Sequence, residues 1–123
     1  MNIWLLVGAV NGFLAVASGA FAAHGLSGRI DTQAVQTFET AARYHMYHAL
    51  AIGLVALCQR GAAAPFAQWA ACFFLVGIVL FSGSLYLFAL TGFRPFAIVT
   101  PFGGLAFLAG WATFAWAATK VAA

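Results

Sequence analysis

Long apolar runs dominate the chain, and they predict helices that cross a membrane. The first run covers residues 3–23, and two more cover residues 66–91 and 96–119, all without a charged side chain. At about 1.5 Å of rise per residue, roughly 20 helical residues span the hydrocarbon of a bilayer. A fourth run, residues 40–59, carries polar side chains in its first half and predicts a weaker span.

The longest polar segment lies between the first two predicted spans. Over residues 32–44 its apolar side chains recur at helical spacing, which predicts an interfacial amphipathic helix that runs straight into the second span. The sequence therefore predicts an all-α fold, an integral membrane four-helix bundle that forms a single domain over residues 1–123. An even number of spans places both chain ends on the same side of the membrane.

Composition and charge support the membrane assignment. Hydrophobic residues make up 65% of the 123 residues and charged residues only 6%, with a mean hydropathy of +1.01, whereas soluble domains carry about 25% charged residues. The net charge is +3, but the five basic residues are scattered singly. They form no patch that could follow a phosphate backbone, so we expect membrane lipids and not nucleic acid as partners.

Ionisable residues gather at one end of the predicted bundle. Eight of the ten fall there, namely His24, Arg29, Asp31, Glu39, Arg43, His45, His48 and Arg94. Ionisable side chains within a membrane usually face the bundle interior and often mark function. We therefore predict a polar pocket at this end, formed by His24, Arg43, His48, Ser82 and Tyr86, with Glu39 and His45 as secondary members.

The histidines leave several chemistries open. His45 and His48 are three residues apart, so both rings can share one helical face, and His24 ends the first span on the same side. Three histidines with Glu39 could ligate a metal ion, and two histidines from different helices could ligate haem. Histidine with tyrosine could form a proton or quinone site, or the rings could simply hydrogen-bond neighbouring groups. The spacing is specific for none of these, so we assign no metal and no cofactor.

The sequence does not point to an enzyme. It shows no nucleophile with a positioned base, no phosphate-binding glycine loop and no paired catalytic carboxylates. We expect a protein without catalytic activity.

Stripes of small residues run along the first and last predicted spans. Their glycines are Gly8, Gly12 and Gly19 in the first span and Gly103 and Gly110 in the last. Small side chains let helix backbones approach closely, which drives helix association where lipid removes the hydrophobic incentive. We expect these glycines to pack helices within the chain or to form an interface between copies.

Four segments carry a resemblance to a known family. They are GAFAAHGL at residues 19–26, FETAARYHMYHAL at 38–50, FSGSLY at 81–86 with LTG at 90–92, and TPFGG at 100–104 with GW at 110–111. In this order they resemble the YgdD/YwdK-like proteins, a family of small four-span membrane proteins known as domain of unknown function 423. The resemblance implies a multi-pass protein of the bacterial inner membrane and carries no activity. His45 stands where the family pattern commonly has Gln, so a two-histidine metal motif is not implied.

Three kinds of function remain open at this level. The first is a structural or accessory membrane component, homo-oligomeric or bound to a larger complex, as the small-residue stripes suggest. The second is a protein that binds or transports a lipid, a quinone or a small solute through the polar pocket. The third is a haem- or metal-binding membrane protein.

Overall fold

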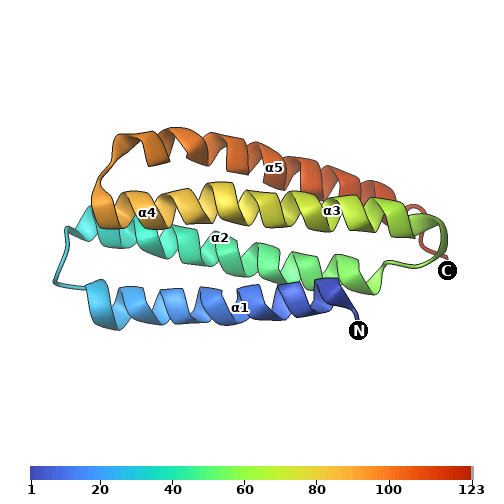
Figure 1. Ribbon diagram of the computed structural model, residues 1–123, viewed down its shortest axis with the longest axis horizontal. Helices are drawn as coiled ribbons and strands as arrows, with labels where there is room; N and C mark the ends of the chain where they lie inside the picture. The colour runs from blue at the N-terminus through green and yellow to red at the C-terminus, as the bar shows by residue number, and fades with distance from the viewer. Residues whose placement is uncertain (123) are drawn as a thin grey trace.

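The computed structural model describes residues 1–122, which form helices without any β-strand. These residues form four long helical rods joined by short connections. The rods run up and down, and both ends of the chain lie at the same end of the bundle (Figure 1). Two of the rods contain a π-helical turn. The elements are α1 (Ile3–Phe21), η1 (Ala22–Leu26), α2 (Thr32–Leu57), η2 (Gly61–Ala63), α3 (Ala64–Gly77), η3 (Ile78–Gly83), α4 (Ser84–Thr91) and α5 (Arg94–Ala118).

Local sequence signals explain where the helices begin and end. The Asn2 side chain accepts a hydrogen bond from the backbone N–H of Leu5 at 3.2 Å and so caps α1. Helices α3 and α5 each carry a proline in the first turn, where its missing N–H costs nothing. Gly92 ends α4 with a φ of +68°, a left-handed conformation that glycine adopts without steric cost.

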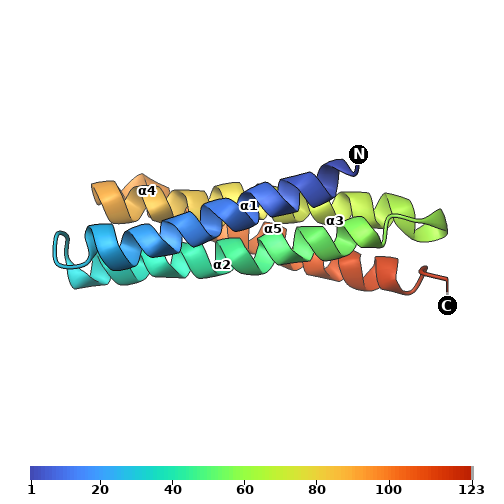
Figure 2. The ribbon, with the colours of Figure 1, turned by 90° about the horizontal axis from the view of Figure 1, so that it is seen from below.

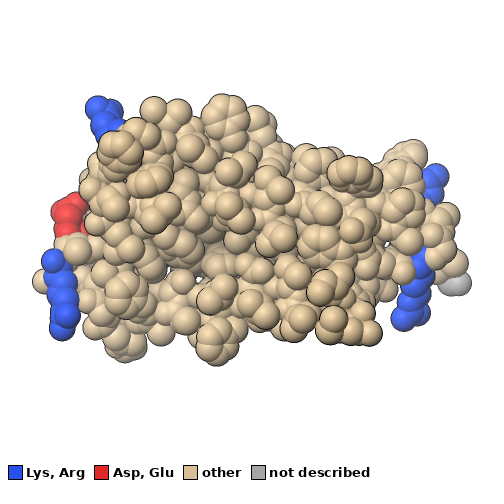
Figure 3. All heavy atoms as spheres, viewed as in Figure 1, with Lys and Arg blue, Asp and Glu red and all other residues tan. Residues whose placement is uncertain are grey.

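The outer surface of the bundle is apolar over most of its length. Large side chains such as Phe13, Ile98 and Leu108 are more than 60% exposed, which in water would be a strong aggregation hazard. On the face drawn in Figure 3, the charged side chains lie only at the two ends. This surface is that of a helical membrane protein.

Three of the helical rods are long and apolar enough to cross a membrane. They are Ile3–Leu26, Gly61–Thr91 and Arg94–Ala118. Helix α2 has a lower mean hydropathy and does not meet this criterion. The predicted interfacial segment, residues 32–44, forms the first half of the continuous helix α2 and is not a separate element. The fourth span and the interfacial placement of this half stay predictions.

Glycines bring α5 into close contact with α3 and η3. A Cβ on Gly110 would come within 2.6 Å of the Phe74 ring, and one on Gly77 would collide with the Phe107 ring. Each helix thus offers a glycine to a phenylalanine of the other. At Gly103 the obstacle is backbone, because a Cβ there would lie 2.7 Å from the carbonyl carbon of Leu80. Two of the predicted packing glycines, Gly103 and Gly110, lie in this interface.

Helix α1 packs chiefly on α2. A Cβ on Gly8 would come within 3.1 Å of both the Ala49 carbonyl oxygen and the Gly53 amide nitrogen, so these two backbones are close. Gly12 and Gly19, by contrast, would meet nothing within 4 Å. Seen from below, α1 crosses the bundle obliquely, with its N-terminal end toward α3 (Figure 2). There Trp4 Nε1 donates a hydrogen bond of 2.7 Å to Gln68 Oε1.

We predict that Gly103→Ala lowers the free energy of unfolding by about 1–3 kcal/mol, because the added methyl must displace backbone of the third rod. Gly104→Ala is the matched control, since a Cβ at Gly104 meets nothing within 4 Å. It should be neutral or stabilise by up to about 1 kcal/mol through helix propensity. Unfolding by titration with a denaturing detergent, followed by circular dichroism, measures both. Equal effects of the two substitutions would contradict the close contact.

Candidate functional site

A hydrogen-bonded network centred on His45 joins three helices inside the bundle. His45 lies on α2 and is buried. Its Nδ1 lies 2.9 Å from the hydroxyl oxygen of Tyr86 on α4, and its Nε2 lies 2.9 Å from Oδ1 of Asn11 on α1. A side chain that lies in the centre of the bundle therefore connects α1, α2 and α4.

The partners fix the direction of each hydrogen bond in this network. Asn11 Nδ2 donates to the Val7 carbonyl oxygen at 2.9 Å, so the amide oxygen faces His45. That oxygen can only accept, and the proton of a neutral His45 ring is therefore on Nε2. Nδ1 is then the acceptor, and the Tyr86 hydroxyl donates to it.

His48 belongs to a separate cluster between α2 and α5. Its ring stacks on Phe107 with a centroid distance of 3.5 Å and an interplanar angle of 6°. Trp111 Nε1 donates to His48 Nε2 at 3.1 Å, and His48 Nδ1 lies 2.7 Å from the Tyr44 carbonyl oxygen. An indole can only donate and a carbonyl can only accept, so the His48 proton is on Nδ1. The two histidines thus hold opposite tautomers.

The serines of η3 and α4 also make contacts between helices. Ser82 is fully buried and donates to the Ala41 carbonyl oxygen on α2 at 2.8 Å. Ser84 Oγ lies 2.6 Å from Thr100 Oγ1 on α5. Among residues 1–122, every buried side-chain nitrogen or oxygen has a hydrogen-bond partner.

The structure does not bring the five predicted pocket residues together. His24 is exposed on the π-helical turn that ends the first rod, and Arg43 is exposed and donates to Thr40 Oγ1 at 3.2 Å. His48, Ser82 and Tyr86 each lie inside the bundle but with different partners.

The two residues predicted as secondary members of the pocket, Glu39 and His45, also lie in different surroundings. Glu39 is half-buried at the surface of α2, whereas His45 is the centre of the largest network. Within the described chain, residues 1–122, no three His, Cys, Asp or Glu side chains are placed so that they could hold a metal ion.

Asn11 and Trp111 are site residues that reasoning from the sequence did not identify. Asn11 lies midway along the first apolar run. A lone amide in an otherwise apolar span is the signal that could have marked it. Trp111 gives no such signal, because a tryptophan in a span is equally typical of a lipid-facing position.

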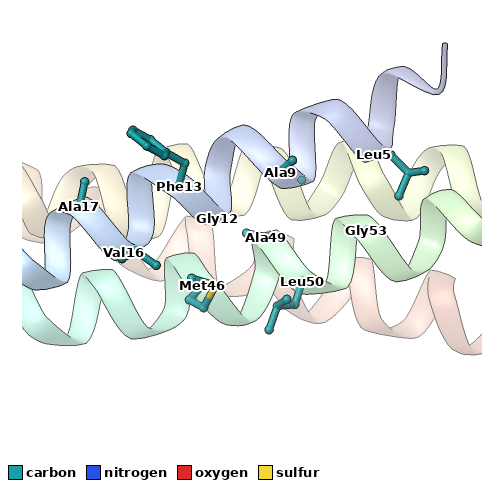
Figure 4. Close-up of a pocket in the computed structure, with 11 residues that line it drawn as sticks. Leu5, Ala9, Gly12, Phe13, Val16, Ala17, Met46, Ala49, Leu50 and Gly53 are labelled. Atoms are coloured by element: carbon teal, nitrogen blue, oxygen red, sulfur yellow. The ribbon is translucent and has the colours of Figure 1, made fainter.

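Three grooves open on the lipid-facing surface. The largest of the three, of about 680 Å³, lies between α1 and α2, and backbone at Gly12 and Gly53 forms part of its wall (Figure 4). A second, of about 520 Å³, is bounded by α1, the η3–α4 rod and α5, and includes His45 and Tyr86. A third, of about 440 Å³, lies between α2 and α5 and includes His48.

Comparisons with known proteins place the chain among membrane proteins. Residues 18–104 match the family model described as a protein of unknown function, DUF423. The chain belongs to this family. It is 41% identical to the UPF0382 membrane protein YwdK of Bacillus subtilis, over 98% of each chain. It is 46% identical to the UPF0382 inner membrane protein YgdD of Escherichia coli K12, over 88% of this chain and 82% of the relative.

These matches confirm the predicted family resemblance and the localisation to the inner membrane. A staphylococcal relative, the UPF0382 membrane protein SERP0230 of Staphylococcus epidermidis, is 39% identical over 99% of each chain. No solved structure matches the chain. Membership of the DUF423 family thus implies a membrane location and carries no molecular function.

We predict that nitrogen-15 NMR of the protein with labelled histidines will show the two buried rings in opposite tautomers at neutral pH. His45 should carry its proton on Nε2 and His48 on Nδ1, because their fixed donors and acceptors allow no other neutral arrangement. Trp111→Phe removes the donor to His48 Nε2 but leaves the Tyr44 carbonyl, so His48 should keep its proton on Nδ1 while its Nε2 resonance shifts and the His45 resonances stay unchanged. The same tautomer for both rings would contradict the network.

Proposed function

We propose that this member of the DUF423 family is a non-catalytic accessory component of the inner membrane, which crosses the bilayer four times and associates with a second copy of itself. The groove between α1 and α2 is the observation that carries the proposal. The internal polar side chains support a non-catalytic role, because they form hydrogen bonds to groups on other helices and so hold the helices together.

The position of α2 supports the fourth span. Helix α2 has 26 residues, which at about 1.5 Å per residue is long enough to cross a bilayer. It packs against α1, α3 and α4, so its buried polar side chains face protein and not lipid. If the three apolar rods cross the membrane, the helix held between them crosses with them.

The shape of the α1–α2 groove supports self-association. Gly12 and Gly53 leave open space above the backbone, so another helix can approach closely. Phe13, which lines the same groove, is 74% exposed and stands out from α1 (Figure 4). A projecting ring beside a glycine-walled hollow is self-complementary, as a two-fold interface requires. In this arrangement Phe13 of each copy fills the hollow of the other.

We predict that reporters fused at the N-terminus and at the C-terminus will lie on the same side of the inner membrane. With four spans, a reporter inserted at Gly28 will lie on the opposite side from both. If α2 did not cross, three spans would place the two termini on opposite sides. Paired reporters active in the cytoplasm or in the periplasm measure this directly, and opposite locations of the termini would contradict the fourth span.

We predict that Gly12→Leu or Gly53→Leu converts a dimer into a monomer in lipid nanodiscs, because the new side chain fills the hollow. Gly19→Leu is the matched control: it is also on α1 in open space, but Gly19 does not line the groove. Single-molecule photobleaching counts the copies in each nanodisc. A wild-type protein that is strictly monomeric would overturn the self-association. Association lost equally in the control would do the same.

A further inference from the structure

The second groove, bounded by α1, the η3–α4 rod and α5, is the one that includes the His45 network and the Asn11 side-chain amide. It measures about 520 Å³, within the range of about 300–1,000 Å³ that small-molecule sites occupy. Its apolar lining includes Val79 and Phe96, and its polar lining includes Asn11, His45 and Tyr86. The polar side chains are therefore gathered inside an otherwise apolar groove that opens toward lipid.

The backbone beside the groove is irregular. Residues Ile78–Gly83 form a π-helical turn, and three of them, Ile78, Val79 and Gly83, line the groove. Such turns widen a helix locally and occur frequently at functional sites. The next residues of the same rod, Ser84, Tyr86 and Leu87 of α4, line the groove as well. An irregular backbone and the His45 network therefore meet in one groove.

Hydrogen-bonding capacity remains at Asn11. Its amide nitrogen carries two protons, and one of them is donated to the Val7 carbonyl oxygen. This is the one hydrogen bond that the amide nitrogen makes within residues 1–122, and the side chain is half-buried and lines the groove. A ligand that accepts a hydrogen bond would satisfy the second proton.

The lining also limits the charge of the ligand. None of the groove residues is Lys, Arg, Asp or Glu. A charged head group would therefore lie unpaired within hydrocarbon, which is strongly unfavourable. The aromatic rings of Tyr86 and Phe96 give the groove a surface suited to a flat ring.

From these observations we propose that this groove binds the head group of a neutral, carbonyl-bearing amphiphile of the quinone class, taken up from the surrounding lipid. Asn11 donates a hydrogen bond to a ring carbonyl, and the apolar tail leaves the groove toward the bilayer. The site shares no residue with the α1–α2 groove, so binding here can be tested independently of self-association.

The test is a titration of the purified protein with decylubiquinone, followed by nitrogen-15 NMR of the histidine rings. Saturable shifts are expected at His45, which lines the groove, and not at His48, which lines another one. Val79→Trp should abolish binding by filling the groove. Leu108→Trp is the matched control, because Leu108 is similarly exposed, at 66% against 61%, but lines the groove of His48. It should leave the Kd within about twofold of wild type.

Two further measurements keep the proposal falsifiable. Asn11→Leu should weaken binding by about tenfold, the effect of one lost hydrogen bond. Decanol has the same tail length but no ring carbonyl and should not produce the shifts. The proposal is overturned by an absence of saturable binding, by equal shifts at both histidines, by equal losses in the two tryptophan variants, or by decanol binding as well as the quinone. Persistence of binding in a monomeric Gly12→Leu variant would separate this site from the dimer interface.

Discussion

A bilayer offers no hydrogen-bond partners to a buried polar group, and this constraint governs the interior of the protein. Each polar side chain within the bundle must find its partner on another helix or on its own backbone. His45 does so with Tyr86 and Asn11, and His48 does so with Trp111 and a carbonyl. Because these bonds join different helices, the demand for partners also fixes how the helices are arranged.

Close packing at glycines also determines how the helices are arranged. Glycines of α3 and α5 accept phenylalanine rings from the facing helix, which places these two helices in intimate contact. Helix α1 packs chiefly on α2, with close backbone contact at Gly8, and reaches α3 through the Trp4 side chain. The α1–α2 groove lies where Gly12 and Gly53 leave open space, and the second groove lies where α1 faces the third rod and α5. Both proposals concern these grooves.

The sequence predicted the membrane class, the all-helical fold and the family. Uncharged apolar runs of about 20 residues are long enough to cross a bilayer as helices, and they are too hydrophobic for the surface of a soluble protein. It also singled out His48, Ser82 and Tyr86, and each of these makes a hydrogen bond to another helix. It could not predict their partners. His24 and Arg43 belong to the same stretch of polar sequence, yet both are exposed, because their helical positions face away from the neighbouring helices. His45 was ranked as secondary but lies at the centre, which depends on contacts more than thirty residues away along the chain.

The glycines illustrate the same division. Sequence spacing placed Gly8, Gly12 and Gly19 on one face of a helix, because helical geometry is local. Only the tertiary structure decided that Gly8 is pressed against α2 while the other two face open space. The sequence alone determined that this chain is a helical membrane protein, because hydropathy and helical period are properties of short segments. Which polar groups pair, and which small residues leave a groove, was decided by the tertiary structure, because both depend on how distant segments approach one another.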